Sequence, residues 1–193
     1  MSVHDAKGNP VEDAVVVAVP LAGAPRPKGK KPTEVIDQID KEFVPAVKVV
    51  QTGTAVAFPN KDNIRHHVYS FSPAKKFELP LYRGMPAAPV VFDRPGVVIL
   101  GCNIHDWMMA YVYVVDSSWF ATTGKGGSAR ILDLPPGDYD VEAYHPRAKD
   151  PAEPLRQRAA VGSEQRAPLS FQMTLKRSVR SSRPPKAGAA DYP

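Results

Sequence analysis

Short runs of alternating apolar and polar residues, separated by turn residues, are the main pattern along this chain. Residues 138–144 and 169–175 place an apolar side chain at every second position, and residues 110–115 alternate small aliphatic and aromatic side chains. A period of two is typical of a strand with one buried face. Residues 97–102 are apolar throughout, which favours a fully buried strand. The pattern therefore predicts an all-β fold.

Turn residues set the remaining expectations, since 21 Pro and 13 Gly argue for many turns and few long helices. Residues 3–19 contain a Gly-Asn-Pro turn that predicts a strand pair or a strand corner. Residues 43–60 contain two β-rich runs around Gln51-Thr52-Gly53, which predicts a hairpin-like pair. Residues 129–134 are expected to form a strand. Residues 69–89 are expected to be an irregular excursion, and residues 146–167 a polar loop.

The candidate chemistry lies directly after the buried strand of residues 97–102. Cys102, His105 and Met108 have the spacing C-x2-H-x2-M, so a short loop can aim a thiolate, an imidazole and a thioether at one point. Thiolate and imidazole with a weak thioether form the ligand set of a blue-copper centre. Zinc also accepts Cys and His, but its structural sites usually contain more thiolates. Cys102 is the single cysteine, so it is either an inert buried thiol or one that takes part in chemistry. A binuclear copper centre needs a second cysteine and is therefore excluded.

A fourth ligand has to come from elsewhere, and the pair His66-His67 is the best donor. Successive strand residues point to opposite faces, so only one of these histidines can point inward. The apolar alternation His67-Tyr69-Phe71 favours His67 as the inward residue. Met109 is likewise the rival of Met108, although the spacing after His105 favours Met108.

The middle of the chain, roughly residues 34–116, resembles the cupredoxins of the plastocyanin-like and amicyanin-like branch, including cupredoxin-like proteins of the methylamine-utilisation type. The residues that carry the resemblance are Phe43-x-Pro45, Gly53-x2-Val56-x-Phe58-x-Asn60-x-Asp62, His66-x-Val68, Pro95-Gly96 and Cys102-x2-His105-x2-Met108.

This resemblance implies a cupredoxin Greek-key β-sandwich with one copper ion per chain. Its His-x-Val pattern favours His66, so the implied ligands are His66, Cys102, His105 and Met108. The implied function is that of a type 1 copper electron carrier, cycling Cu(II) and Cu(I) with a redox partner protein in the periplasm. The edge of His105 is then the expected exit for the electron, with Trp107 and Met109 beside it.

The two flanks carry a second resemblance, to the carboxypeptidase regulatory-like sandwiches of transthyretin type. It lies in Val3-x-Asp5-x2-Gly8-x-Pro10-Val11-x2-Ala14-Val15-Val16 and in Leu134-Pro135-Pro136-Gly137-x-Tyr139-x-Val141. Neither flank is complete alone. The resemblance therefore implies that residues 1–22 and 117–176 form one small β-sandwich, split by the copper domain of residues 34–116.

Charge changes the picture only at the C-terminal end. The formal net charge is +5, and residues 176–193 contain five basic residues against one acidic residue, so the body is nearly neutral. We therefore expect no nucleic-acid binding, and a disordered basic tail over residues 177–193 that can contact an acidic partner. No apolar run is long enough to span a bilayer, and no basic-then-apolar leader precedes the first strand stub, so a soluble chain is expected.

Enzyme activity is not expected from this sequence. His4 and His145 lie outside the copper motifs and are expected to be ordinary surface or turn histidines. No nucleophile triad or carboxylate pair is visible in the spacing, and four protein ligands leave little room for a substrate on the metal. The alternative to an electron carrier is a copper-binding or structural interaction module without that role.

Overall fold

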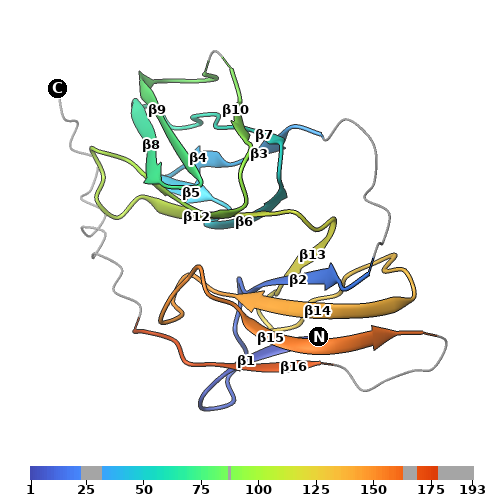
Figure 1. The fold of residues 1–193 in the computed structure, drawn as a ribbon. Helices are drawn as coiled ribbons and strands as arrows, with labels where there is room; N and C mark the ends of the chain where they lie inside the picture. Colours follow the sequence, from blue (N-terminus) through green and yellow to red (C-terminus); the bar gives the residue numbers. More distant parts are fainter. Residues whose placement is uncertain (23–31, 87, 163–168, 178–193) are drawn as a thin grey trace.

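The computed structural model describes residues 1–22, 32–86, 88–162 and 169–177, which form two β-sandwiches stacked one on the other (Figure 1). The described residues contain no helix, and therefore none that could cross a membrane. The predicted all-β class is confirmed. Of the predicted tail of residues 177–193, residues 178–193 lie outside the described residues.

The upper sandwich in Figure 1 contains the middle of the chain. Its larger sheet has the strand order β6-β12-β11-β8-β9, and its smaller sheet has the order β10-β7-β3, with the hairpin β4–β5 beside them. The strands are β3 (Glu34–Val35), β4 (Asp37–Ile39), β5 (Glu42–Val44), β6 (Val47–Gln51), β7 (Thr54–Ala57), β8 (His66–Ser72), β9 (Lys75–Tyr82), β10 (Val90–Phe92), β11 (Gly96–Gly101) and β12 (Met109–Val115).

A single apolar core fills the space between the sheets of the upper sandwich. It is built from inward residues of both sheets, such as Val56, Phe58, Val98 and Val112, and it includes Cys102. The run of residues 97–102 is a strand as expected, although only its alternate residues Val98 and Leu100 are fully buried.

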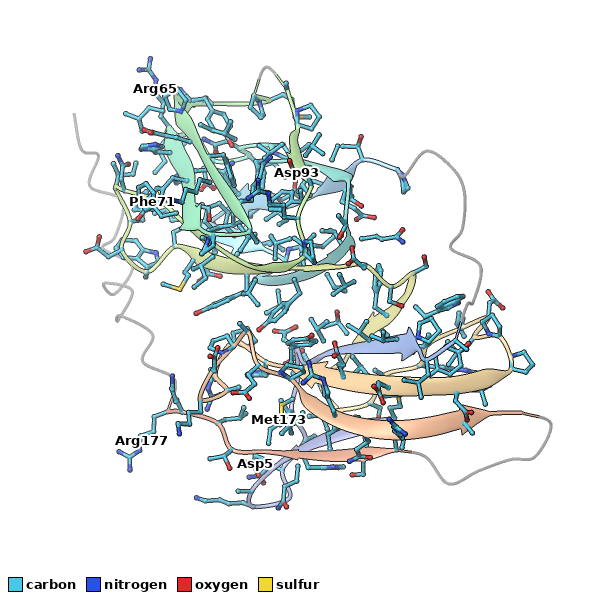
Figure 2. The ribbon with its side chains drawn as sticks, in the orientation of Figure 1. Asp5, Arg65, Phe71, Asp93, Met173 and Arg177 are labelled. Carbon is cyan, nitrogen blue, oxygen red and sulfur yellow. The ribbon has the colours of Figure 1, made fainter. Side chains whose placement is uncertain are left out.

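The lower sandwich combines the two ends of the chain. Its four-stranded sheet has the order β13-β2-β14-β15, and β1 pairs in parallel with β16 across from it. The strands are β1 (Ser2–Asp5), β2 (Val15–Pro20), β13 (Trp119–Thr122), β14 (Gly137–Tyr144), β15 (Leu155–Val161) and β16 (Ser170–Met173). Met173 and Asp5 label these paired end strands in Figure 2.

Strand β2 is buried on both of its faces. Val16 and Ala18 point into the core of the lower sandwich, whereas Val15 and Val17 pack against Tyr113 in a cluster that joins the two sandwiches. A strand that is buried on both faces needs a continuous apolar run. Residues 15–19 provide it.

Several local expectations were wrong. The turn at Gly53 (φ 87°) does not close a hairpin, because it carries the chain from β6 in one sheet to β7 in the other. Residues 129–134 are not a strand, since Asp133 has φ 52° and its carbonyl accepts the Trp119 indole N–H at 3.3 Å.

The segments expected to be irregular contain two strands, β9 and β15. Each is the last strand of its sheet. An edge strand tolerates Pro80, because its outer backbone groups need no partner in the sheet. In β15, Arg156 pairs with Glu142 on the neighbouring strand at 2.9 Å, which explains why a polar segment forms a strand.

His145 is buried rather than a surface histidine. Its Nε2 donates to the Glu12 carbonyl at 3.2 Å, and its Nδ1 accepts the Arg147 N–H at 3.0 Å. Burial lowers the pKa of His145 to about 4, the hydrogen bond to Glu12 acts in the opposite direction, and the charge of Arg147 adds to the lowering. The neutral ring therefore ties the turn after β14 to the loop before β2.

Stability should depend on pH through His145. The unfolded chain binds a proton near pH 6.5 and the folded chain only near pH 4, so the contribution of His145 is complete above pH 6.5 and is lost as the pH falls to about 4. The loss amounts to about 3 kcal/mol. Urea unfolding of the wild type and of His145→Asn should show the wild type losing stability relative to the variant in this window. Parallel pH profiles would contradict the assignment.

We propose that residues 1–22 and 117–176 form one folding unit and residues 34–116 another. Deletion of residues 1–22 removes β1 and the central strand β2, so amide-exchange protection should fall across β13 and β14. Protection should remain across β11, which keeps both of its neighbours. Equal loss in β11 and β14 would instead indicate one cooperative domain.

Candidate metal centre

Cys102 lies at the end of β11, where the chain leaves the sheet and turns back into β12. Strand β11 runs antiparallel to β12, with Gly101 opposite Met109, so residues 102–108 form the connection between the two strands. The Met108 N–H donates to the His105 carbonyl at 2.9 Å and closes this loop. The loop therefore presents Cys102 and His105 on the same side.

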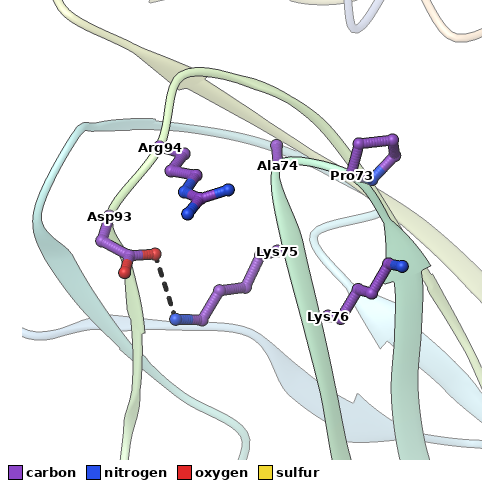
Figure 3. A pocket seen from close by; sticks show the side chains of 6 residues that line it. All are labelled: Pro73, Ala74, Lys75, Lys76, Asp93 and Arg94. Carbon is purple, nitrogen blue, oxygen red and sulfur yellow. Dashed lines mark hydrogen bonds and ion pairs between the residues drawn. The ribbon is translucent and has the colours of Figure 1, made fainter.

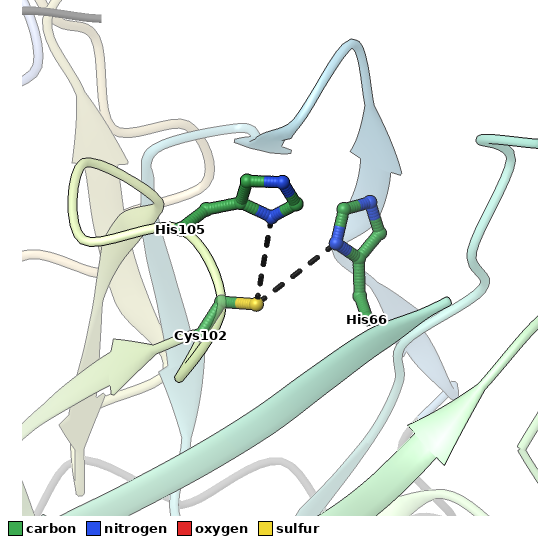
Figure 4. A group of neighbouring side chains, drawn as sticks. All are labelled: His66, Cys102 and His105. Atoms are coloured by element: carbon green, nitrogen blue, oxygen red, sulfur yellow. Dashed lines mark hydrogen bonds between the residues drawn. The ribbon is translucent and has the colours of Figure 1, made fainter. Parts of the chain in front are cut away.

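His66 comes from the neighbouring strand β8. Its side chain points toward Cys102, and the His105 ring approaches from the loop (Figure 4). Cys102 Sγ lies 3.9 Å from His66 Nδ1 and 3.8 Å from His105 Nδ1. The three ligand atoms all lie within 4.8 Å of one another, and all three residues are buried.

These distances fit a metal ion between the three side chains. Bonds of about 2.3 Å to a thiolate and about 2.0 Å to an imidazole nitrogen, meeting at roughly 120°, separate the two ligand atoms by about 3.7 Å. The donors are a soft thiolate and two imidazoles, the equatorial set of a trigonal copper site. The residues therefore fit a mononuclear copper ion.

Asp62 fixes the ring of His66. Its Oδ2 lies 2.7 Å from His66 Nε2, and a carboxylate can only accept, so Nε2 carries the proton. When the ring is neutral, Nδ1, the atom that faces Cys102, has its lone pair available for a metal. Asp62 in turn accepts the backbone N–H groups of Asp40 at 2.7 Å and of Lys41 at 2.9 Å.

The hairpin β4–β5 supplies these two N–H groups. Asp40 and Lys41 form its two-residue turn, and both have positive φ (53° and 61°), as this tight type of hairpin requires. Asn60 holds the loop that carries Asp62, since its side chain donates to the carbonyls of Ile64 at 2.9 Å and Tyr82 at 2.8 Å. The orientation of His66 thus depends on three separate segments of the chain.

The charges around the cluster favour an ionised thiol. Burial alone would raise the pKa of Cys102, but the His66 ring and the backbone N–H groups of His67 and Ile104 outweigh it, so the pKa is lowered. Burial would lower the pKa of His66, but its contacts with Cys102 and Asp62 outweigh burial and raise it. The pKa of His105 is lowered by burial and by the charges of His66 and Lys41, which favours the neutral ring.

Of the paired candidates, the structure brings His66 and Met108 to the inside. Met108 is fully buried in the same core as Cys102, whereas Met109 is largely exposed. The His67 ring lies on the opposite face of β8, packed edge-on against Tyr69, with its Nε2 2.9 Å from the Glu78 carboxylate. The alternation of His67, Tyr69 and Phe71, which favoured His67 as the inward residue, therefore belongs to the outer face of β8.

His105 is nearly covered, with 8% of its surface exposed. The Trp107 ring stands 5.0 Å from it, between centroids, at 55°. Trp107 was expected beside His105 and lies there, but the Asp62 contact was missed, although the spacing Asp62-x3-His66 carried the signal.

Two hollows lie outside the cluster. A surface hollow of about 460 Å³ lies at the β8–β9 turn, where Lys75 pairs with Asp93 at 3.1 Å (Figure 3). It is at the opposite end of β8 from His66. A larger cleft of about 1080 Å³ lies between the sandwiches and is lined in part by Trp107, Met109, Tyr111 and His145. The cleft therefore reaches the loop that carries His105.

No protein-family model and no curated protein matches the chain. Among solved structures, the chain is similar to a copper-containing nitrite reductase from Thermus scotoductus (23% identity, 49% of this chain and 25% of that chain, TM-score 0.40). It is also similar to a purple cupredoxin from Nitrosopumilus maritimus (22% identity, 42% and 98%, TM-score 0.38) and to an oxidised amicyanin variant (21% identity, 42% and 81%, TM-score 0.38). The chain spans only a quarter of the nitrite reductase.

The two neighbouring histidines should respond differently to substitution. His66→Ala removes a ring that faces Cys102, so it should abolish the intense colour expected with Cu(II). His67→Ala removes a ring from the outer face and serves as the matched control, so the colour should remain with at most a shifted band. Visible spectra of both variants check this, and the opposite result would assign the ligand to His67.

Proposed function

We propose that this chain is a type 1 copper protein that carries electrons, with one copper ion per chain held by His66, Cys102, His105 and Met108. The observation that carries the proposal is the buried triangle of one thiol and two imidazoles with separations of 3.8 and 3.9 Å. Copper bound there supplies a one-electron couple between Cu(II) and Cu(I). The positions of the ligands and their burial are set by the chain's own residues.

The fold itself holds the proposed ligands in place. The β-sandwich fixes Cys102 at the end of a strand, and Asp62 fixes the His66 ring. Met108 is buried in the same core as Cys102, and a thioether suits the role of a weak fourth ligand. A site that changes little between two oxidation states needs little reorganisation for each electron transfer, and burial keeps water away from it.

A carrier rather than an enzyme fits this arrangement. With four protein side chains around the metal, the site has no open position for a substrate. The proposed reaction partner is another redox protein, and the proposed location is the periplasm. The basic tail can add contacts to an acidic partner. The rival function, a copper-binding interaction module, predicts binding of copper without reversible electron transfer.

Adding Cu(II) should give an intense blue or green colour that saturates at one copper per chain, because a thiolate bound to Cu(II) absorbs strongly in the visible. Cys102→Ser should abolish the band, while the control His145→Asn, which removes a histidine outside the site, should keep it. Voltammetry should then show a reversible couple. A band that survives in Cys102→Ser, or a protein that binds only Cu(I) without a reversible couple, would sink the proposal.

A further inference from the structure

The outer face of the large sheet of the upper sandwich is mostly apolar on β12, β11 and β8, whereas the edge strand β9 carries charged residues there. On β12, β11 and β8, the residues that alternate with the core residues Ala110, Leu100 and Val68 point to this face. The strand register places Tyr111 opposite Ile99, and Gly101 lies opposite both Met109 and Tyr69. Phe71 follows Tyr69 on the same side of β8, with their ring centroids 5.1 Å apart.

The lower sandwich covers only part of this face. Val47, Tyr113 and Val115 are buried in the cluster between the sandwiches, and Tyr111 packs against its margin. Beyond Tyr111 the face is open: Phe71 is 76% exposed, Ile99 41% and Met109 48%. Figure 2 shows Phe71 on the side of the upper sandwich. We call His67, Tyr69, Phe71, Ile99 and Met109 the open face.

The open face lies directly against the residue that precedes the thiol. A Cβ on Gly101 would come within 2.9 Å of the Tyr69 ring, so this ring rests on the backbone of Gly101. Gly101 is covalently joined to Cys102. A molecule seated on Tyr69 is therefore separated from the sulfur by one aromatic ring and one stretch of backbone.

Charge and area indicate what kind of molecule fits. Lys76 stands opposite Phe71 and Glu78 opposite Tyr69 on the edge strand β9, so the margin has one charge of each sign. Recognition then depends on apolar contact rather than on net charge. The exposed side chains offer on the order of 300 Å², whereas a stable interface takes about 800 Å² from each partner. This size fits a transient encounter, as between electron-transfer proteins.

We propose that the open face is the docking surface for the redox partner protein, and that the partner contributes an apolar surface of its own. This inference rests on the proposed function, and it names the surface at which the carrier meets its partner. It differs from docking over His105, since that ring is nearly covered by its neighbours.

The first test uses a c-type cytochrome as the probe, with both proteins reduced so that no electron passes. Amide chemical shifts of the Cu(I) protein should change at residues 67–71 and 97–101. In the double variant Phe71→Ser/Ile99→Ser, the size of these chemical-shift changes should fall at least fivefold. Both side chains are exposed, so neither change should disturb folding. Leu132→Ser, an equally exposed apolar residue on the lower sandwich, is the matched control and should change nothing.

The second test measures rates by stopped flow. One electron passes from the ferrous cytochrome to the Cu(II) protein, and its second-order rate constant should fall about tenfold in the double variant, with little dependence on ionic strength. Reduction by hexaammineruthenium(II), which needs no docking surface, should keep its rate, and the visible band should not change.

The outcomes separate the two proposals. Shift changes confined to the cleft, an unchanged rate in the double variant, an equal fall in Leu132→Ser, or no reaction with the cytochrome would overturn the docking face and leave the copper carrier intact. A protein without a reversible copper couple would overturn the carrier and with it the redox role of this face, even if the shifts mapped there.

Discussion

The contact between Asp62 and His66 is the constraint on which the candidate site depends. An imidazole has two nitrogens, and a metal ligand is useful only if the correct one is deprotonated and aimed. In the neutral ring the 2.7 Å contact meets both needs, because the carboxylate binds the proton of Nε2 and Nδ1 faces Cys102. Asp62 is itself held by two N–H groups of the Asp40-Lys41 turn. The small hairpin β4–β5 is thereby part of the site, although it contributes none of the three clustered ligand atoms.

The same logic explains why the ligands come from a β-sandwich. A loop alone cannot hold a thiol and two imidazoles at 3.8–3.9 Å, since each loop residue has two soft backbone angles. Here Cys102 leaves β11 where β11 is paired with β8 and β12 on both sides. The neighbouring strand provides His66, and the return into β12 fixes the other end of the loop. Position is therefore transmitted through backbone hydrogen bonds between strands.

Sequence patterns predicted the features that depend on residues close together in the chain. They missed the features that depend on partners from distant parts of the fold. The soft ligands in Cys102-x2-His105-x2-Met108 were visible because they lie within seven residues. The choice between His66 and His67 was not decided by alternation, because His67, Tyr69 and Phe71 form an aromatic row on an outer face that alternates as a buried face does. Strands β9 and β15 were missed because edge strands accept Pro80 and charged residues that argue against a strand in the middle of a sheet. The turn at Gly53 was found, but nothing local distinguishes a turn within a sheet from one between sheets.

The lower sandwich adds more than a flanking unit, because it decides which part of the upper sandwich stays open. Val15 and Val17 of β2, together with the Tyr113–Tyr144 contact at 5.5 Å, occupy one half of the large sheet's outer face. A contiguous apolar patch on the exposed face of a sheet marks an interaction site or is covered by another part of the chain. The lower sandwich covers the half farther from Gly101 and leaves the half against which Tyr69 rests. The arrangement thus leaves the apolar surface open where the path to the thiol is shortest.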